Sequence, residues 1–277
     1  GGGTALRFDT IEMAVFDIFI LKRKGASNQH SPSAIEKAEK KFRTMRKCEK
    51  ERLLASIMAG LPGAYRRYSI PELRDALNCY NGIDKATLKS NFRRFLKEVM
   101  PTAAELGIRL CIHPDDPPQD ILGLPRIVST ESDIDWIMSE ENYFCNGLTL
   151  CSGSLGAHWN NNILDIARRF SHRVHFAHLR NIIKEFDGSF QESSHLQGDL
   201  DMVSLIEILL KEEKFRQEAG CKYYQIPFRP DHGHDLLSDT QRGTHPGYPL
   251  IGRMRGLAEL RGVTHALSYR EDLTVKA

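Results

Sequence analysis

The fold is decided by residues 148–179, which read LTLCSGSLGAHWNNNILDIARRFSHRVHFAHL. Two short apolar runs, Leu148–Cys151 and Val174–Leu179, stand at its ends, and the helical pattern Asn162–Phe170 lies between them. Strand, helix and strand at this spacing are typical of a βαβ unit, whose two strands run parallel. The stretch therefore predicts an α/β fold with a parallel sheet.

The same alternation continues outward on both sides. Further strands are expected at Ile108–His113, Ile226–Pro230 and Val263–Ser268, and further helices at Ile134–Glu140, Met202–Glu218 and Leu250–Leu260. A helical block precedes this part of the chain. Its three expected helices run from the capping box Ser33–Glu36 to the stop Gly60–Gly63, from the capping box Ser69–Glu72 to about Tyr80, and from Asp84 to about Leu106 with Pro101 as a candidate break. Residues 5–23 are apolar but of mixed period, and no element is assigned to them.

Composition excludes two classes of protein. Of 277 residues, 41% are hydrophobic and 27% are charged, so the chain can bury a sizeable core and is not disordered. The longest apolar stretch, Ile11–Leu21, contains Glu12 and Asp17, and it is too short for the ~20 apolar residues of a membrane-spanning helix. The six cysteines have irregular spacings with no CxxC pair, which is typical of reduced thiols in a cytoplasmic protein.

Charge is distributed unevenly. Residues 21–100 carry 19 Lys and Arg against 8 Asp and Glu. A solvated helical face explains such a block, and so does an electrostatic funnel for a small acid. No nucleic-acid recognition motif accompanies the charge, so we expect no nucleic-acid partner.

One metal-capable side chain stands at the carboxyl end of each of four successive strands: His113, Cys151, His178 and Asp231. In a parallel β/α barrel these ends converge on one mouth, where active sites are built. A single His or Cys at a strand end is more often structural, but the recurrence favours a shared metal site. The thiolate suggests Zn²⁺ or Fe²⁺, whereas open positions for substrate oxygens favour six-coordinate Fe²⁺ or Mn²⁺.

Other side chains near these strand ends are candidates for substrate chemistry. His232 follows Asp231 and is a candidate general base, or a surface loop histidine. Tyr248, in a turn-rich loop, is a candidate acid or simply a loop aromatic. Arg180 and Arg229 adjoin two proposed ligands, where they could clamp a substrate carboxylate or form structural ion pairs.

These residues lie in segments that resemble the mannonate dehydratase family across essentially the whole chain. The matching segments are Ala5–Asp9, His113–Pro118, Ile121–Thr130, Asn146–Ser154, His178–Arg180, His195–Met202, Arg229–His234, Pro246–Tyr248 and Ile251–Arg253. The family's motifs follow in order, which makes the resemblance specific.

The resemblance implies a metal-dependent lyase on a xylose-isomerase-like (β/α)8 TIM barrel. It implies removal of water from D-mannonate to give 2-dehydro-3-deoxy-D-gluconate, in the breakdown of glucuronate. It also implies Mn²⁺ or Fe²⁺ on His113, Cys151, His178 and Asp231, with His232 and Tyr248 as the acid–base pair. Arg180, His195 and Arg229 are then assigned to substrate binding, and we expect a cytoplasmic homo-oligomer. The alternatives are another metal-dependent sugar isomerase or sugar-acid dehydratase, and an inactive, truncated metal-binding relative.

The chain departs from the family in its number of strands. Five are expected here and the family has eight, so we expect that the first three β/α units are missing and that residues 1–277 form one incomplete barrel domain. Residues 30–106 are expected to be a helical insertion near the barrel mouth, where their positive charge would favour an anionic sugar acid.

Overall fold

The computed structural model describes residues 3–59 and 68–276, and its centre is a four-stranded parallel sheet. The strands are β2 (Leu110–Ile112), β3 (Asn146–Cys151), β4 (Val174–His178) and β7 (Phe228–Arg229), in the order β2-β3-β4-β7. All three pairings are parallel, and Cys151 is in register with His178 across β3 and β4. The predicted α/β fold with a parallel sheet is confirmed.

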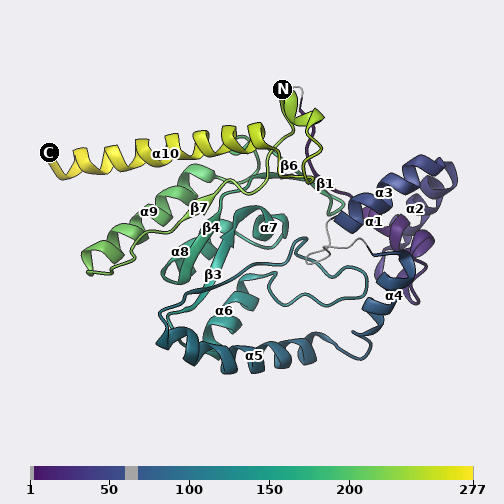
Figure 1. Cartoon of the computed structure of the whole chain (residues 1–277), viewed down its shortest axis with the longest axis horizontal. Coiled ribbons are helices and arrows are strands. Elements are labelled where there is room, and N and C mark those ends of the chain that lie inside the picture. Colours follow the sequence, from purple (N-terminus) through teal and green to yellow (C-terminus); the bar gives the residue numbers. More distant parts are fainter. Residues whose placement is uncertain (1–2, 60–67, 277) are drawn as a thin grey trace.

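Helices pack around this sheet and form the main core. They are α5 (Lys85–Glu105), α6 (Glu131–Glu140), α7 (Ser152–Ala157), α8 (Ile163–Phe170), α9 (Met202–Glu218) and α10 (Leu250–Lys276). Leu148 and Leu150 of β3 are fully enclosed together with Ile166 of α8 and Leu205 of α9. Figure 1 shows α5 along one side of the molecule and α10 along the opposite side.

The structure also contains an antiparallel sheet that was not predicted from the sequence. It has the order β1-β6-β5 and consists of β1 (Arg7–Phe8), β5 (Ile182–Lys184) and β6 (Phe190–Glu192). Its strands have two or three residues each, too few for a readable alternation of apolar and polar positions. The sheet ties the start of the chain to the segment that follows β4.

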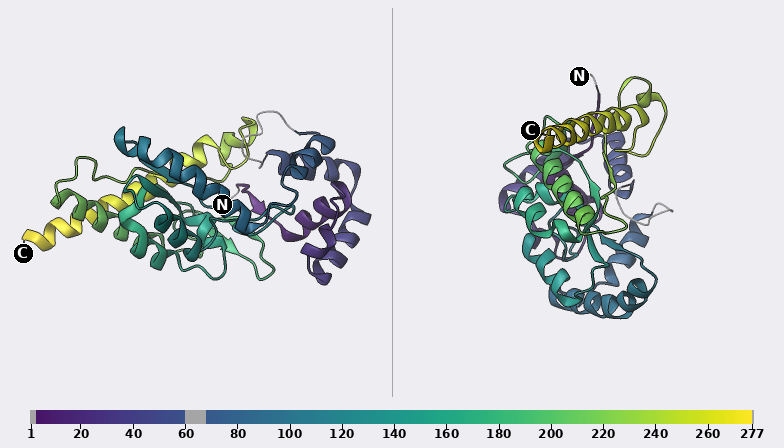
Figure 2. Two further views of the ribbon diagram at one scale, coloured as in Figure 1. Left: turned by 90° about the horizontal axis from the view of Figure 1, so that it is seen from below. Right: turned by 90° about the vertical axis from the view of Figure 1, so that its left-hand side faces the viewer.

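The N-terminal helices form a unit with its own core. After β1 come α1 (Thr10–Ala14), a π-helical turn (Val15–Ile20), a 3-10 turn (Ala26–Gln29), α2 (Pro32–Thr44), α3 (Lys47–Ala59) and α4 (Ile70–Asn78). Phe16 and Leu21 are fully buried there among side chains of α2, α3 and α4. Figure 2 shows these helices at one end of the molecule and the end of α10 at the other.

Several predicted helix boundaries need correction. The hydroxyl of Ser31, not Ser33, caps α2, because it accepts from the Ala34 amide and Pro32 occupies the first turn. The single helix expected there is two, since Met45 is extended between α2 and α3. The predicted stop at residues 60–63 lies outside the described residues. The box at Ser69 and the cap at Asp84 are confirmed, and α5 continues through Pro101 without a break.

The predicted strand at Val263–Ser268 is wrong. These residues continue α10, in which the Thr264 hydroxyl donates to the Leu260 carbonyl at 2.9 Å. Leu260, Val263 and Leu267 recur at helical spacing and pack against the main core. The short β-branched run is therefore one face of a helix rather than a strand.

The described residues thus hold four parallel strands where five were expected, with β2 and β7 at the two edges of the sheet. No helix in the described ranges is both long and apolar enough to cross a membrane.

Candidate metal centre

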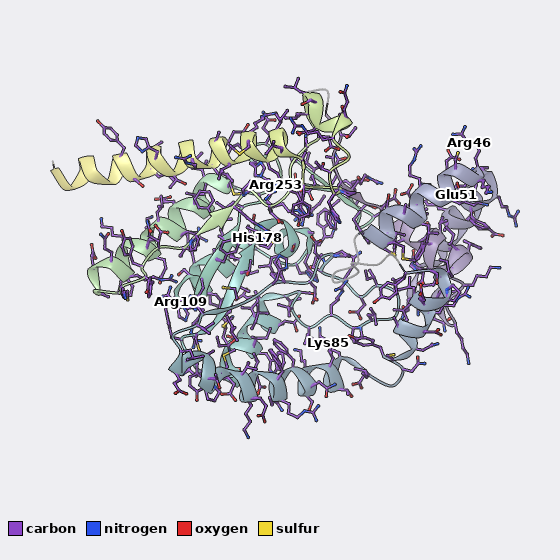
Figure 3. The ribbon with its side chains drawn as sticks, viewed as in Figure 1. Arg46, Glu51, Lys85, Arg109, His178 and Arg253 are labelled. Carbon is purple, nitrogen blue, oxygen red and sulfur yellow. The ribbon has the colours of Figure 1, made fainter. Side chains whose placement is uncertain are left out.

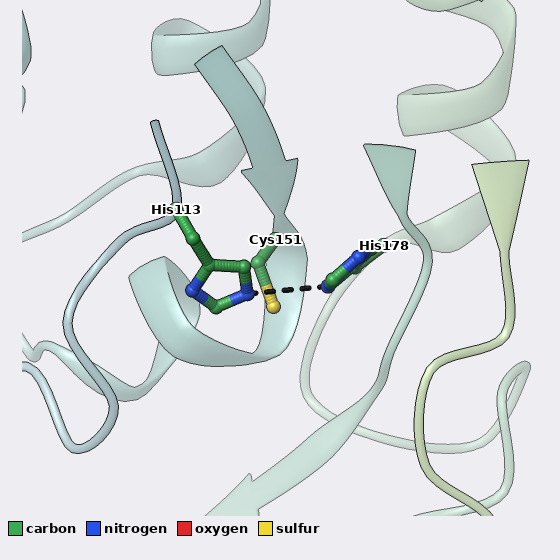
Figure 4. A group of neighbouring side chains, drawn as sticks. All are labelled: His113, Cys151 and His178. Atoms are coloured by element: carbon green, nitrogen blue, oxygen red, sulfur yellow. Dashed lines mark hydrogen bonds between the residues drawn. The ribbon is translucent and has the colours of Figure 1, made fainter. Parts of the chain in front are cut away.

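His113, Cys151 and His178 converge at the carboxyl ends of three adjacent strands. His113 directly follows β2, Cys151 is the last residue of β3, and His178 is the last residue of β4. Their ligand atoms all lie within 4.8 Å of one another, and His113 Nε2 is 3.2 Å from His178 Nδ1. Figure 4 shows the two imidazoles on either side of the Cys151 sulfur. The ligands converge because the strands are parallel and in register, which places their last residues side by side.

Asp231 brings a carboxylate to the same cluster from beyond β7. Its Oδ1 lies 3.6 Å from His178 Nδ1, and its Oδ2 lies 3.9 Å from Cys151 Sγ. The side chain is buried, and the backbone has a φ of 61°, in the left-handed region that is unfavourable for residues other than glycine. All four predicted ligands therefore lie at one end of the sheet.

The electrostatics of the cluster suit a cation. Burial, reinforced by the Asp231 carboxylate, raises the pKa of the Cys151 thiol to about 12. Burial lowers the pKa of His178 to about 4, so its imidazole is neutral and keeps a lone pair. Burial acts to raise the pKa of Asp231, but the neighbouring histidines and arginines lower it overall. Two imidazoles, a thiol and a carboxylate form a donor set that fits a divalent transition ion, whose charge would favour the thiolate.

Helix α7 starts at Ser152, and its first residues form hydrogen bonds with the segments that carry the ligands. The Ser154 hydroxyl lies 3.1 Å from Cys151 Sγ, and the Ser152 hydroxyl bonds to the backbone of His178 and Arg180. A Cβ at Gly153 would lie 2.5 Å from Arg180 Cδ, so glycine is needed for this close approach.

The candidate acid–base pair lies together beside these ligands. The rings of His232 and Tyr248 are nearly perpendicular, with centroids 5.1 Å apart. His232 Nδ1 is 2.8 Å from Oε1 of Glu192, and burial raises the pKa of Tyr248. Gly247, with a φ of 83°, makes the turn that brings the tyrosine into place.

The three residues assigned to substrate binding differ in their surroundings. Arg180 is buried and pairs with Asp116 and Glu192. Of the two roles considered for it, a substrate clamp or a structural ion pair, these contacts match the ion pair. His195 is also buried, and its Nε2 lies 2.8 Å from the carbonyl of Pro230. Arg229 contacts Asp231 Oδ1 at 2.8 Å and keeps 38% of its side chain exposed. Arg229 is therefore the one of the three with a partly open side chain, and the binding roles stay predictions.

Sequence reasoning missed Glu192, Asp116 and Ser154. Asp116 and Ser154 lie within the matching segments His113–Pro118 and Asn146–Ser154. The resemblance therefore includes these two residues, but it assigned no role to them. Glu192 belongs to a strand too short to predict. Of the basic block, Figure 3 shows Arg46 at the outer end of the N-terminal helices, well away from His178.

Comparisons with known proteins identify the family of the chain. The sequence model described as D-mannonate dehydratase (UxuA) matches residues 1–273. The chain is 47% identical over 271 residues to the mannonate dehydratase of Rhizobium meliloti, covering 97% of this chain and 67% of that protein. It is also 47% identical over 268 residues to the enzyme of that name from Chromohalobacter salexigens, covering 96% of this chain and 68% of that protein.

A solved structure of the same family also matches the chain. The crystal structure of mannonate dehydratase from Streptococcus suis serotype2 matches with a TM-score of 0.61 and 32% sequence identity. The match covers 69% of this chain and 52% of that one, so the chain spans about two thirds of the curated relatives and about half of the solved structure. The match along the whole chain decides the family: this chain belongs to the D-mannonate dehydratases.

Proposed function

We propose that this chain carries the active site of a D-mannonate dehydratase, which removes water from D-mannonate to give 2-dehydro-3-deoxy-D-gluconate. The observation that carries the proposal is the convergence of His113, Cys151 and His178 at the strand ends, with Asp231 in contact with two of them. We assign these four residues as ligands of Mn²⁺ or Fe²⁺. When bound, the ion would stabilise the negative charge that develops on the substrate.

His232 and Tyr248 are assigned to move the protons. The proton at C2 of a sugar acid is α to a carboxylate and very weakly acidic, so its removal needs a positioned base. We assign His232 as the base that takes this proton. Tyr248 keeps its proton, because burial raises its pKa, and we assign it as the acid that protonates the departing C3 hydroxyl. The reverse assignment uses the same pair. Exchange of the C2 proton with deuterated solvent, measured in His232→Ala and Tyr248→Phe, distinguishes the two, because only the variant that lacks the base should lose the exchange.

The wider setting follows from the same family. We propose that the parallel sheet and its helices belong to a xylose-isomerase-like (β/α)8 barrel, with residues 30–106 as a helical insertion near its mouth. We propose also that the protein is a cytoplasmic homo-oligomer. All six cysteines are free, which is compatible with a reducing compartment. Light scattering during size-exclusion chromatography tests the oligomer.

The decisive experiment measures bound metal and turnover on the same protein. Protein loaded with Mn²⁺ or Fe²⁺ is incubated with D-mannonate, D-gluconate and a ketose, and the 2-keto-3-deoxy product is quantified. We expect product from mannonate only. Isomerisation of the ketose or dehydration of gluconate instead would favour a rival enzyme, and bound metal without any turnover would refute the enzyme assignment.

Variants then test the assigned pair. His232→Ala and Tyr248→Phe should each lower kcat by about 10²–10⁴-fold, the usual contribution of a general acid or base, without loss of metal. The exposed residues His265 and Tyr269 on α10 provide matched controls, His265→Ala and Tyr269→Phe, which should leave kcat unchanged. Near-full turnover in either site variant would contradict the assignment.

A further inference from the structure

Glu192 lies buried between the candidate base and an arginine. Its side chain is 3% exposed, and Oε1 is 2.8 Å from His232 Nδ1. On its other side, Arg180 Nη2 is 2.6 Å from Oε1 and Arg180 Nε is 3.0 Å from Oε2. A buried carboxylate is costly unless it is paired and hydrogen-bonded, and here both requirements are met.

The backbone around Glu192 is fixed as well. The Glu192 amide donates to the Leu6 carbonyl at 2.9 Å, and the Glu192 carbonyl lies 3.3 Å from His234 Nε2. The two-pronged contact with Arg180 sets the plane of the carboxylate, because a guanidinium presents its donors in a rigid fork. The backbone contacts and the Arg180 pair therefore fix the position of Glu192, so its carboxylate can fix the position of the His232 ring.

From these contacts we infer that Glu192 is a positioning residue that fixes the ring and the tautomer of His232. An ionised carboxylate only accepts hydrogen bonds, so the proton of the neutral His232 ring sits on Nδ1 and Nε2 carries the lone pair. Within residues 3–59 and 68–276 we find no hydrogen-bond partner for Nε2. That nitrogen is the one available to take a proton from substrate.

The inference rests on the proposed function and adds a role to it. The C2–H bond breaks and its proton passes to His232 Nε2, while its electron pair forms the C2–C3 double bond. The C3–O bond breaks, and the leaving hydroxyl takes the Tyr248 proton and departs as water. In this assignment Glu192 exchanges no proton with the substrate. It holds the imidazole and stabilises the positive charge that the ring gains.

Glu192→Gln is the first test, because the amide keeps the shape of the side chain. The amide has one acceptor oxygen in place of two, and it carries no charge. Because Arg180 donates to both carboxylate oxygens and Oε1 also faces His232 Nδ1, the variant cannot keep all three contacts. We expect kcat for mannonate to fall about 10²–10⁴-fold, because the acceptor and the charge that hold the protonated ring are lost, while KM changes less than threefold.

Two measurements separate positioning from a merely structural role. With C2-deuterated mannonate, Glu192→Gln should show a larger isotope effect on kcat than the parent protein, because proton removal becomes the slow step. Glu192→Asp, which keeps the charge, should recover part of kcat. Glu185→Gln is the matched control: Glu185 follows β5, pairs with Arg7 at 2.8 Å and keeps 39% of its side chain exposed, so its loss should change neither kcat nor the isotope effect.

A third measurement needs no variant at Glu192 and no activity. In protein labelled with ¹⁵N-histidine and loaded with diamagnetic Zn²⁺, long-range ¹H–¹⁵N spectra report each tautomer, and His232 is assigned by its loss in His232→Ala. We expect Nδ1–H. A proton on Nε2, or unchanged kcat in a folded Glu192→Gln protein, would overturn the inference. Absence of mannonate turnover in the parent protein would instead refute the proposed function and leave the tautomer test standing.

Discussion

The hydroxyl of Ser154 lies 3.1 Å from the sulfur of Cys151, one helical turn earlier in the chain. Both side chains are fully buried or nearly so. A hydroxyl at this distance donates to a thiolate, and it also acts to lower the pKa of Cys151 against the larger effect of burial. Ser154 therefore supports the metal-binding form of the cysteine without being a ligand itself.

The first prediction follows from this contact. Ser154→Ala should weaken Mn²⁺ binding by about tenfold, the lower end of what the loss of an outer hydrogen bond to a ligand costs. Competition with a chelating dye measures the affinity, and a shifted sulfur-to-Co²⁺ charge-transfer band reports the sulfur directly. Ser189→Ala is the control, since Ser189 is buried but bonds to Thr10, away from the cluster. Equal affinities in both variants would exclude this role.

The second prediction concerns the proton on Cys151. Since burial raises the thiol pKa to about 12 and lowers that of His178 to about 4, the metal-free site holds a thiol and a neutral imidazole at pH 7. Metal binding should then release about one proton per ion, and affinity should rise about tenfold per pH unit. Calorimetry in buffers of different ionisation enthalpy counts the proton. Cys151→Ala should bind weakly and release none; release that persists in this variant would assign the proton elsewhere.

Sequence alone was sufficient for the parallel sheet and for the cluster, and the reason is geometric. Parallel strands end at one edge, so single polar residues at successive strand ends predict a shared site without knowledge of contacts. His113, Cys151, His178 and Asp231 all lie together there. Adjacency in the chain likewise placed His232 beside Asp231.

What failed depends on contacts that a sequence pattern does not carry. The run Val263–Ser268 has β-branched residues, but its helical spacing outweighs strand propensity once one face packs on the core. Strand β6 is three residues long, so the position of Glu192 is fixed by its pairing with β1 and β5 rather than by local pattern. Arg180 was placed near the ligands correctly, but only the fold shows that two carboxylates surround its guanidinium.

The third prediction tests that ion-pair network by stability. Arg180→Met should lower the free energy of unfolding by about 3–5 kcal/mol, because it leaves the buried Glu192 carboxylate without its cation. Urea denaturation measures the loss. The double variant Arg180→Met/Glu192→Gln removes the stranded charge and should recover part of it. If the double variant is less stable by the sum of the two single losses, the pair is not coupled and the network account is wrong.

The fourth prediction concerns His175, a buried residue of β4 whose Nε2 lies 2.7 Å from the Phe144 carbonyl. Burial lowers its pKa from 6.5 to about 4 in the folded chain. Between these values the unfolded chain binds a proton that the folded chain does not, so stability falls as the pH drops from about 6.5 towards 4. At about 1.4 kcal/mol per pH unit, His175 contributes no more than about 3 kcal/mol to this loss.

His175→Gln removes that titration while its amide can still donate to the Phe144 carbonyl. Urea denaturation at pH values from 7.5 to about 4.5 should therefore show a smaller loss of stability on acidification than in the parent protein. The loss does not vanish, because burial also lowers the pKa of His178 and of His195. His265→Gln, at an exposed position of α10, is the control and should keep the parental slope. If stability falls equally steeply with pH in His175→Gln and in the parent, His175 does not cause the loss of stability on acidification. The loss would then be assigned to the other buried histidines.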